Sequence, residues 1–184
     1  MGADYGDTLV VISYHPYNTY QTPAAVAREA FYNTGLTVPY VVFDGTNPVW
    51  EQNPTNYDSV FRQAIEVART VTPYFNLYIN SATASPSTGN LDFSIITADT
   101  IPDGEIIAYV AILQDSLPGS YTAFYKVCQE LYAMPLELTY PDTLDTVITF
   151  PHAVPVEKLS AVIFIQDTLS KEVMQSISST FQEE

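Results

Sequence analysis

The sequence predicts a β-rich protein in which a small α/β part precedes a larger all-β part. Its 184 residues are 47% hydrophobic, which is enough for a packed core. Fourteen tyrosines, nine phenylalanines and thirteen prolines favour strands and turns over helices. After Thr72-Pro73 the hydrophobic period changes from about 3.6 to about 2. We therefore predict one domain over residues 1–72 and a second over residues 73–184.

The first part is expected to begin with a strand and a helix. Residues 8–14, "TLVVISY", form an almost continuous apolar run, which is typical of a strand buried on both faces. The helix that follows has Thr22 as its cap, Pro23 in its first position and Gly35 at its end. Its buried face is predicted to contain Val26, Ala27, Ala30 and Phe31.

A second strand and a second helix complete this part. "PYVVF", residues 39–43, is expected to form a strand that turns at Asp44-Gly45 toward a short partner around Val49-Trp50. The second helix is predicted to be capped by Thr55, with Asp58 three residues later in a variant of the capping box. Its apolar stripe consists of Tyr57, Val60, Phe61, Ala64, Ile65, Ala68 and Val71. The predicted order is β-α-β-β-α.

The second part is expected to hold about seven strands separated by turn-rich breaks. They are predicted near residues 77–79, 91–95, 106–113, 121–131, 144–150, 159–166 and 172–178. Strand spacing of this kind indicates an immunoglobulin-like sandwich. The short "TVTPY" junction indicates that the two parts pack closely together.

The charge and the cysteine count limit the function. The net charge is −15, of which −11 falls in residues 73–184, so the chain should repel phosphate backbones, and nucleic acid is not an expected partner. A single cysteine, Cys128, cannot form an intrachain disulfide or a cysteine-based zinc site. No apolar run reaches about 18 residues, so we expect no membrane-spanning segment. Met1 is followed by "GADYGD", which does not have the pattern of a secretory signal.

Several residues could carry chemistry, but each also has a structural interpretation. Ser13, His15 and Asp44 could be read as a hydrolytic set, although they lack the turn that usually presents a nucleophile. We expect His15 and His152 to be structural. Cys128 could be a redox or lipid-bearing thiol, but its apolar neighbours favour an inert, buried side chain.

Two surface features could bind ligands. The acidic loops at residues 99–105 and 141–145 could hold calcium, although neither has the ligand spacing of a helix-loop-helix site and both suit ordinary exposed turns. An aromatic group could form a binding face or pack in the core. It consists of Tyr14, Tyr17, Tyr20, Phe31, Tyr32 and Tyr40.

Three segments together resemble a known family. "GDTLVVISYHPY", "AREAFYNTGLTVPYVVFDG" and "SAVIFIQDTLSKEVMQS" are similar to segments of the outer-membrane-protein-like secreted thioredoxin-fold proteins of Gram-negative bacteria. In that family a closing hairpin often reads aromatic-x-Gln-Asp and then Lys-Glu-Val-x-Gln. The matching positions here are Phe164, Gln166, Asp167, Lys171, Glu172, Val173 and Gln175.

The resemblance implies a fold of the class α/β plus all-β. A partial thioredoxin-like β-α-β-β-α unit would pack on a seven-stranded immunoglobulin-like sandwich. Many members carry a Cys-x-x-Cys upstream of the strand that matches residues 8–14, but this chain has no such pair, and no redox residue is carried over. The missing upstream strand would leave a gap between the strand at 8–14 and the strand at 40–43. Another chain, a neighbouring copy or direct contact of the two strands would have to fill that gap.

These observations lead to an expected function and site. We expect a non-enzymatic extracellular or outer-membrane-associated interaction module, without cofactor or metal, that binds a protein partner or its own copies. The partner-facing strand is predicted at Val38, Pro39, Tyr40 and Val42, and the family fold implies a cis Pro39 that presents Val38, against an ordinary strand-entry proline. Two alternatives stay open: the C-terminal part of a secreted thiol-disulfide oxidoreductase, and a calcium- or carbohydrate-binding sandwich.

Overall fold

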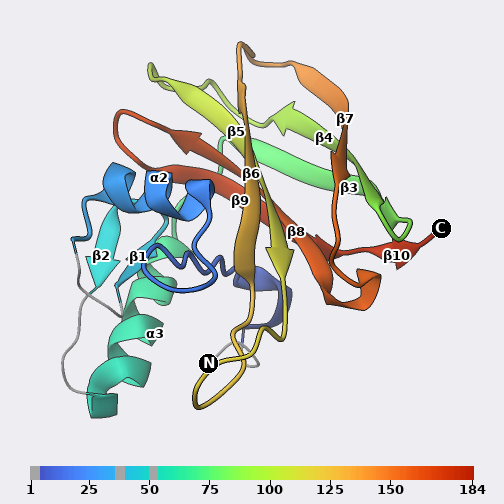
Figure 1. The fold of residues 1–184 in the computed structure, drawn as a ribbon. Helices are drawn as coiled ribbons and strands as arrows, with labels where there is room; N and C mark the ends of the chain where they lie inside the picture. The colour runs from blue at the N-terminus through green and yellow to red at the C-terminus, as the bar shows by residue number, and fades with distance from the viewer. Residues whose placement is uncertain (1–4, 36–39, 50–53) are drawn as a thin grey trace.

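A computed structural model describes residues 5–35, 40–49 and 54–184 of the chain. Two four-stranded sheets pack face to face, and the N-terminal third of the chain lies against one of them (Figure 1). The sheets are built from β3 (Phe75–Ala84), β4 (Thr88–Thr97), β5 (Ile106–Gln114), β6 (Val127–Pro135), β7 (Thr143–Pro151), β8 (Leu159–Asp167), β9 (Val173–Thr180) and β10 (Gln182–Glu183). A short 3-10 turn, Val156–Lys158, precedes β8.

The strand order is β10-β3-β4-β7 in one sheet and β6-β5-β8-β9 in the other. All neighbours are antiparallel except β10, which runs parallel to β3. The seven strands β3 to β9 match the seven predicted from the alternating pattern, with one correction. The strand predicted at 121–131 is observed at Val127–Pro135, because residues 115–126 form an irregular loop that ends at Lys126, whose φ is +54°.

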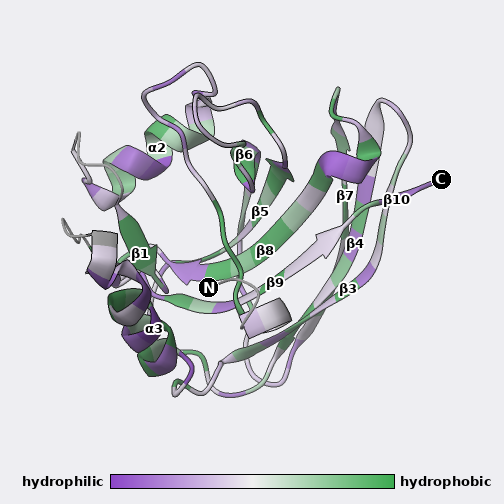
Figure 2. Cartoon of the chain, turned by 90° about the horizontal axis from the view of Figure 1, so that it is seen from below, coloured by the Kyte–Doolittle hydropathy of each residue, from purple (hydrophilic) through white to green (hydrophobic). Residues whose placement is uncertain are grey.

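The main core lies between the two sheets, because alternate side chains of a strand lie on the same face. In Figure 2 much of strand β8 has the colour of hydrophobic residues. Strand β8 contributes Leu159, Ala161, Ile163 and Ile165 to this core. In the register of the sheet, Ile163 lies opposite Val110 of β5 and Ile177 of β9. The period of 2 in the sequence therefore corresponds to a sandwich interior.

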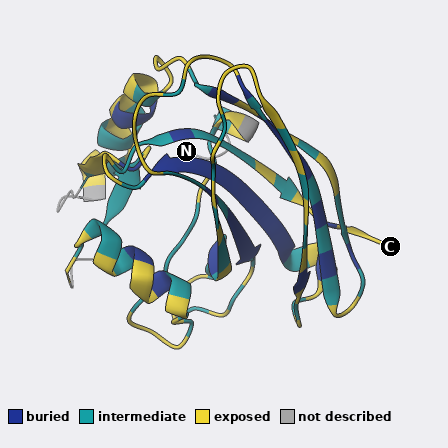
Figure 3. Ribbon diagram, turned by 90° about the horizontal axis from the view of Figure 1, so that it is seen from above, coloured by how far each residue is buried: buried dark blue, intermediate teal, exposed yellow. Residues whose placement is uncertain are grey.

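A second apolar layer covers the outer face of the β6-β5-β8-β9 sheet. The other side chains of β8, including Val162 and Phe164, pack there with Cys128 and with Val10, Ile12 and Tyr14 of the N-terminal segment. Helix α2 (Pro23–Tyr32) lies over the same face. As a result all nine residues of β8 are buried. In Figure 3 this strand lies near the centre and is dark blue, the colour of buried residues, over almost its whole length.

The segment at residues 8–14 differs from its prediction. It is extended, but its only bridge in the described residues is Ser13 with Val127, parallel to the edge of β6. The Ser13 N–H donates to the Lys126 carbonyl at 2.8 Å, and the Cys128 N–H donates to the Ser13 carbonyl at 2.9 Å. A short 3-10 turn, Gly6–Thr8, precedes it. The apolar run is explained by packing against the sandwich instead of by burial within a sheet.

Helix α2 begins as predicted but turns a different face inward. The Thr22 Oγ1 accepts from the Ala25 N–H at 3.1 Å, and Pro23 occupies the first turn. Ala25 and Arg28 are buried, whereas Ala27 and Ala30 are exposed and Val26 is 44% exposed. The helix ends at Tyr32, and the next residue, Asn33, has φ +52° and takes the left-handed capping position predicted for Gly35. The predicted face was wrong because a buried arginine, which polarity alone places outside, faces the sheet.

The remaining elements form a small layer beside the sandwich. Strands β1 (Val41–Phe43) and β2 (Asn47–Val49) form the predicted antiparallel hairpin, and helix α3 (Tyr57–Ala68) packs on it. Phe43 lies 5.6 Å from Phe61, ring centre to ring centre. The 3-10 turn Pro54–Asn56 leads into α3, so Asn56 instead of Thr55 precedes the helix, and it makes no side-chain cap. The predicted stripe holds except at Val71, which lies beyond the helix and is exposed.

The described residues 8–14 and 41–43 do not share a sheet, so the expected gap between two such strands is not formed. Strand β1 pairs only with β2 in the described part of the chain. Neither described helix has the length and apolar character needed to cross a bilayer.

Candidate interaction site at the β1–β2 hairpin

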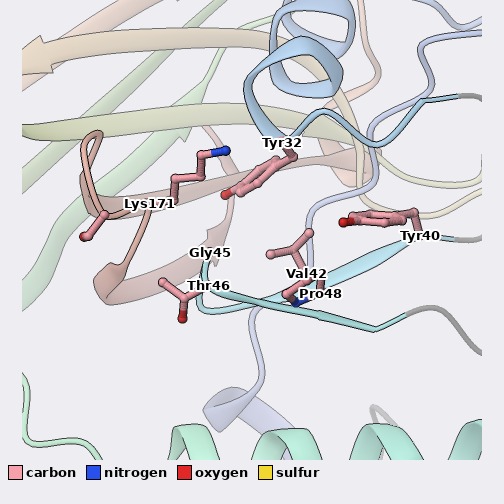
Figure 4. A pocket seen from close by; sticks show the side chains of 8 residues that line it. Tyr32, Tyr40, Val42, Gly45, Thr46, Pro48 and Lys171 are labelled. Atoms are coloured by element: carbon pink, nitrogen blue, oxygen red, sulfur yellow. The ribbon is translucent and has the colours of Figure 1, made fainter.

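A cavity of about 240 Å³ lies between the β1–β2 hairpin, the end of α2 and the β8–β9 turn (Figure 4). Its lining residues are Tyr32, Tyr40, Val42, Gly45, Thr46, Pro48, Ser170 and Lys171. Tyr40 and Val42 face it together because alternate residues of an extended chain lie on one face. On the other face, Phe43 packs against α3. Two of the four predicted partner-facing residues therefore line a cavity, and Val38 and Pro39 lie outside the described residues.

The backbone of Val42 is turned away from β2. Val42 pairs with Pro48, which has no N–H to donate. The pair must therefore be of the non-hydrogen-bonded kind, in which the bonds run between the flanking residues Val41 and Val49, and Phe43 and Asn47. The Val42 N–H and C=O consequently point to the outer edge of the hairpin, and neither has a hydrogen-bond partner among the described residues. Unpaired strand edges of this kind are the places where sheets add further strands.

The turn of the hairpin is fixed to the sandwich. The Val173 N–H donates to the Asp44 carbonyl at 2.9 Å. Gly45 has φ +76°, and a Cβ atom at this position would lie 1.7 Å from the Lys171 carbonyl oxygen. Burial, and then the nearby Glu172 carboxylate, raise the pKa of Asp44. The Asp-Gly pair therefore makes the predicted turn and also permits the close contact with the β8–β9 turn.

A buried polar cluster lies behind the cavity. Gln166 is fully buried, and its Oε1 accepts from the Arg28 Nη2 at 2.9 Å. Its Nε2 donates to the Tyr32 hydroxyl at 3.0 Å and to the Lys171 carbonyl at 2.6 Å. Arg28 also donates to the Tyr32 hydroxyl at 2.7 Å. Gln166 thereby connects helix α2, strand β8 and the β8–β9 turn.

Aromatic rings surround the guanidinium of Arg28, whose residue is only 5% exposed. The guanidinium carbon lies between 4.7 and 5.9 Å from the centres of the rings of Tyr14, Phe31, Tyr32, Tyr109 and Phe164. Ring faces attract a cation, and they replace the carboxylate that a buried arginine usually has. Burial, only partly offset by Arg28, raises the pKa of the Tyr14 hydroxyl well above its usual range.

The turn after β8 is held by Asp167. Its carboxylate accepts from the backbone N–H groups of Glu105, Leu169 and Ser170 at 3.0 to 3.1 Å. Burial acts to raise the pKa of Asp167, but hydrogen bonds from the Ser170 side chain and from these N–H groups outweigh it, so that the pKa is lowered. The aromatic-x-Gln-Asp pattern thus supplies a ring to the Arg28 cluster, a bridging amide and a turn.

The suggested hydrolytic set is not assembled. Ser13 forms the bridge to β6, and Asp44 lies in the hairpin turn. His15 lies 2.7 Å from the Asn18 Nδ2 through its Nδ1 and packs edge-on against Phe124. No hydrogen bond links Ser13, His15 and Asp44 in the described structure. His152 lies 2.9 Å from the Val154 carbonyl through its Nδ1.

Cys128 and the acidic loops show no ligand geometry. Cys128 is buried, and burial raises the pKa of its thiol to about 12. Asp142 accepts from the Thr139 N–H and hydroxyl at 2.9 Å each, which is turn geometry. Across residues 5–35, 40–49 and 54–184, no three His, Cys, Asp or Glu side chains come close enough together to hold a metal ion.

The predicted aromatic group divides into separate parts. Tyr14, Phe31 and Tyr32 surround Arg28, and Tyr40 lines the cavity. The Tyr17 hydroxyl donates to the Gly35 carbonyl at 2.6 Å, and Tyr20 packs with His15 and Phe124. Arg28 itself was not predicted as a site residue. It is the only lysine or arginine before Arg62, within a helical segment whose other residues, except Glu29, are apolar or aromatic, and that placement was the available signal.

These features define a class of structure: a two-sheet β-sandwich with one outer face covered by a smaller helical and hairpin layer. HBP35 of Porphyromonas gingivalis is a solved structure with this fold. The alignment has a TM-score of 0.68 at 7% sequence identity and covers 86% of this chain and 58% of HBP35. The chain therefore spans little more than half the length of HBP35, and identity this low shows a common fold alone.

Two further solved structures align with this chain too weakly to show a common fold. A domain of the outer membrane lipoprotein Omp28 from Porphyromonas gingivalis aligns with a TM-score of 0.42 at 12% identity, over 62% of this chain and 93% of that domain. A β-glucosidase from Kluyveromyces marxianus aligns with a TM-score of 0.36 at 9% identity, over 60% of this chain and 14% of the enzyme. No protein-family model and no curated protein sequence matches the chain.

Proposed function

We propose that this chain is a non-enzymatic interaction module of the cell exterior that binds an extended segment of another polypeptide at the outer edge of β1. The observation that carries the proposal is the orientation of Val42, whose N–H and C=O face away from β2 because Pro48 cannot donate. A segment added beside β1 would satisfy both groups.

The cavity makes such a contact selective. In strand addition, backbone hydrogen bonds supply affinity, and pockets for alternate side chains supply specificity. One side chain of the added segment would enter the cavity between Tyr40, Val42 and Pro48. The volume of about 240 Å³ is below the roughly 300–1,000 Å³ of sites for drug-sized ligands and suits a single side chain.

The finer assignments of fold and location belong to the same proposal. The order β10-β3-β4-β7 and β6-β5-β8-β9 brings β7 back beside β4 after two strands of the other sheet, which supports an immunoglobulin-like Greek key. A hairpin with α3 on one face and α2 above the other supports a reduced thioredoxin-like unit. The acidic composition and the segment resemblance support an extracellular or outer-membrane-associated position.

The test combines solution mass with hydrogen exchange at Val42. Sedimentation is measured from about 1 μM to about 1 mM, which covers association free energies of about −8 to −4 kcal/mol. If a neighbouring copy supplies the segment, the mass rises with concentration and the Val42 amide becomes protected. Val42→Pro removes the N–H and should abolish the rise in mass, whereas the control Val42→Ile keeps the N–H and should retain both the rise in mass and the protection of the residue 42 amide.

For a partner other than a second copy, arrays of synthetic extended peptides replace the concentration series. A peptide that binds the wild type and Val42→Ile but not Val42→Pro supports strand addition. A well-folded monomer at every concentration, with an unprotected Val42 amide and no bound peptide, would contradict the proposal.

A further inference from the structure

The loop between β5 and β6 forms a braced projection, which we call the finger (residues 115–126). At its base, Lys126 Nζ lies 2.8 Å from the Asp115 Oδ2, and the Lys126 N–H donates to the Asp115 Oδ1 at 2.6 Å. Further out, Leu117 and Phe124 exchange backbone hydrogen bonds at 2.8 and 3.1 Å. The two sides of the finger are therefore joined at its base and again two residues further along, as in a short hairpin.

Side chains of the N-terminal segment support the finger from beneath. The Phe124 ring lies 4.6 Å from His15 and 5.9 Å from Tyr20 between ring centres. The Tyr20 hydroxyl donates to the Pro118 carbonyl at 2.7 Å. At the tip, a Cβ atom on Gly119 would lie 2.0 Å from the Thr122 carbonyl oxygen, so the turn requires glycine. These contacts fix the direction of the tip.

The tip presents Tyr121, which is 103% exposed relative to its reference state and so makes almost no packing contact. A tyrosine side chain has only two torsion angles, so it loses little conformational entropy on binding, and Tyr is enriched among the residues that dominate interface energies. The composition of the tip, Gly-Ser-Tyr-Thr, is typical of a recognition loop. The bracing and the exposure together indicate an anchor for binding.

The cavity at the β1–β2 hairpin offers apolar surface to such a ring. Tyr40, Val42 and Pro48 line it, together with Thr46 and Lys171, and the Lys171 ammonium lies beside Tyr32 (Figure 4). Lys171 Nζ donates to the Phe31 carbonyl at 2.8 Å and lies 5.2 and 6.0 Å from the ring centres of Phe31 and Tyr32. An ammonium carries three protons, and within the described residues this is its one hydrogen bond, so it can also donate to a phenol oxygen. A tyrosine side chain fits a cavity of about 240 Å³.

We propose that the Tyr121 ring of one copy enters the hairpin cavity of a second copy. The finger cannot reach its own cavity, because its base is pinned and Figure 1 shows the β5–β6 connection well apart from β1 and β2. This inference names the side chain that enters the cavity of the proposed function; it rests on that function for the binding role of the cavity and not for the pairing of strands at β1. The contact is heterologous: each copy offers a finger at one place and a cavity at another, so copies can add head to tail.

The net charge gives this contact a distinctive salt dependence. Every copy carries −15, so two copies repel each other, whereas the tip and the apolar walls of the cavity are uncharged. Salt shortens the Debye length to about 8 Å at 0.15 M and about 3 Å at 1 M. Self-association should therefore strengthen as salt increases, opposite to an assembly held by ion pairs.

The experiment uses two variants that each remove one half of the contact. Tyr121→Ala removes the anchor and Thr46→Trp fills the cavity mouth; both positions are exposed, so folding should be retained. In sedimentation experiments at 0.5 M salt, each variant alone should self-associate at least about tenfold more weakly than the wild type. Mixed together they should form a heterodimer and stop there, because the Thr46→Trp finger still fits the Tyr121→Ala cavity.

Matched controls separate this contact from general adhesion. Tyr78→Ala removes a 52% exposed tyrosine of β3 and Thr46→Val keeps the cavity open, so both should self-associate like the wild type.

The pattern of variants that lose self-association distinguishes the two proposals. If Val42→Pro loses self-association and Tyr121→Ala does not, the role of the finger is overturned and strand addition is still supported. Loss with Tyr121→Ala and Thr46→Trp but not with Val42→Pro would support the finger and contradict strand pairing. A monomeric wild type at about 1 mM in high salt would overturn the inference.

Discussion

The Arg28 Nη2 donates to the Gln166 Oε1 at 2.9 Å across 138 positions of sequence. Both residues are buried, and the bond joins helix α2 to the outer face of strand β8. Because Gln166 also binds Tyr32 and the Lys171 carbonyl, this one amide holds the helix, the sheet and the wall of the cavity in a fixed relation. The candidate site is therefore built on a rigid support.

Truncating Gln166 should destabilise the whole chain. Gln166→Ala leaves the Arg28 guanidinium, the Tyr32 hydroxyl and the Lys171 carbonyl short of a partner, and each such buried group costs about 1–3 kcal/mol. We expect the free energy of unfolding to fall by about 3 kcal/mol or more, measured by urea titration. Gln129→Ala is the control: Gln129 is only half-buried and donates one bond, at 3.3 Å, so its loss should cost about 0.5 kcal/mol or less. Equal losses for the two variants would contradict the role assigned to Gln166.

Gly45 and Gly35 form a matched pair for testing how the hairpin is attached. Both have positive φ, +76° and +64°, so alanine strains either backbone by about 1 kcal/mol. At Gly45 the added Cβ would also lie against the Lys171 carbonyl oxygen, whereas at Gly35 no atom of the described residues lies within 4 Å. Gly45→Ala should therefore lower the free energy of unfolding by about 2 kcal/mol more than Gly35→Ala does. It should also deprotect the Val173 amide in hydrogen exchange, and protection equal to the wild type would argue against a fixed hairpin.

The carboxyl of Asp44 should make stability depend on pH. Burial and the Glu172 carboxylate raise its pKa in the folded state above the usual 3.8, so the folded chain binds this proton more tightly than the unfolded chain does. The contribution of Asp44 is therefore most favourable below pH 3.8 and is lost as the pH rises through the raised pKa. Asp44→Asn removes the charge and tolerates the φ of +43°, so it should raise the Tm at pH 7.

The gain from Asp44→Asn should shrink as the solution is acidified toward pH 4, because the wild-type carboxyl then becomes neutral as well. Thermal unfolding of both proteins across this range provides the measurement. A lower Tm for Asp44→Asn at pH 7 would show that the ionised carboxylate stabilises the turn.

Cys128 should react with thiol reagents only after unfolding. Its side chain is buried and its thiol pKa is raised to about 12, so almost no thiolate is present or accessible at neutral pH. The reaction with an aromatic disulfide reagent should be slow in buffer and fast in denaturant. Cys128→Ala should leave self-association unchanged. Rapid labelling of the folded chain would reopen the interpretation of Cys128 as a functional thiol.

Local patterns predicted most elements because the physics behind them is local. Alternation placed six of the seven long strands, Thr22 and Pro23 placed the start of α2, and Asp44-Gly45 placed the hairpin turn. The exception among the strands, β6, begins after the finger, whose Tyr and Phe residues have the composition of a strand. Its Phe124 packs on His15 and Tyr20 instead, and its two tyrosines are exposed. Composition cannot distinguish these two environments.

The candidate site was predicted only in part. The run at residues 40–43 indicated a strand with an accessible edge, and Tyr40 and Val42 do line the cavity. Its position beside Lys171 and Ser170 depends on contacts across more than 120 residues, for which no local pattern exists. The division into domains at residue 72 and the absence of catalysis stay predictions.

Local sequence patterns were enough to predict the kinds of element, because alternation, capping residues and turn residues act over a few positions. The buried face of α2 and the packing of residues 8–14 depend instead on contacts between distant parts of the chain. Arg28 can be buried because five aromatic rings and the buried amide of Gln166 surround its guanidinium, several of them from distant segments of the chain. A cation is accepted in the interior only where such groups surround it, and their convergence arises when the chain folds.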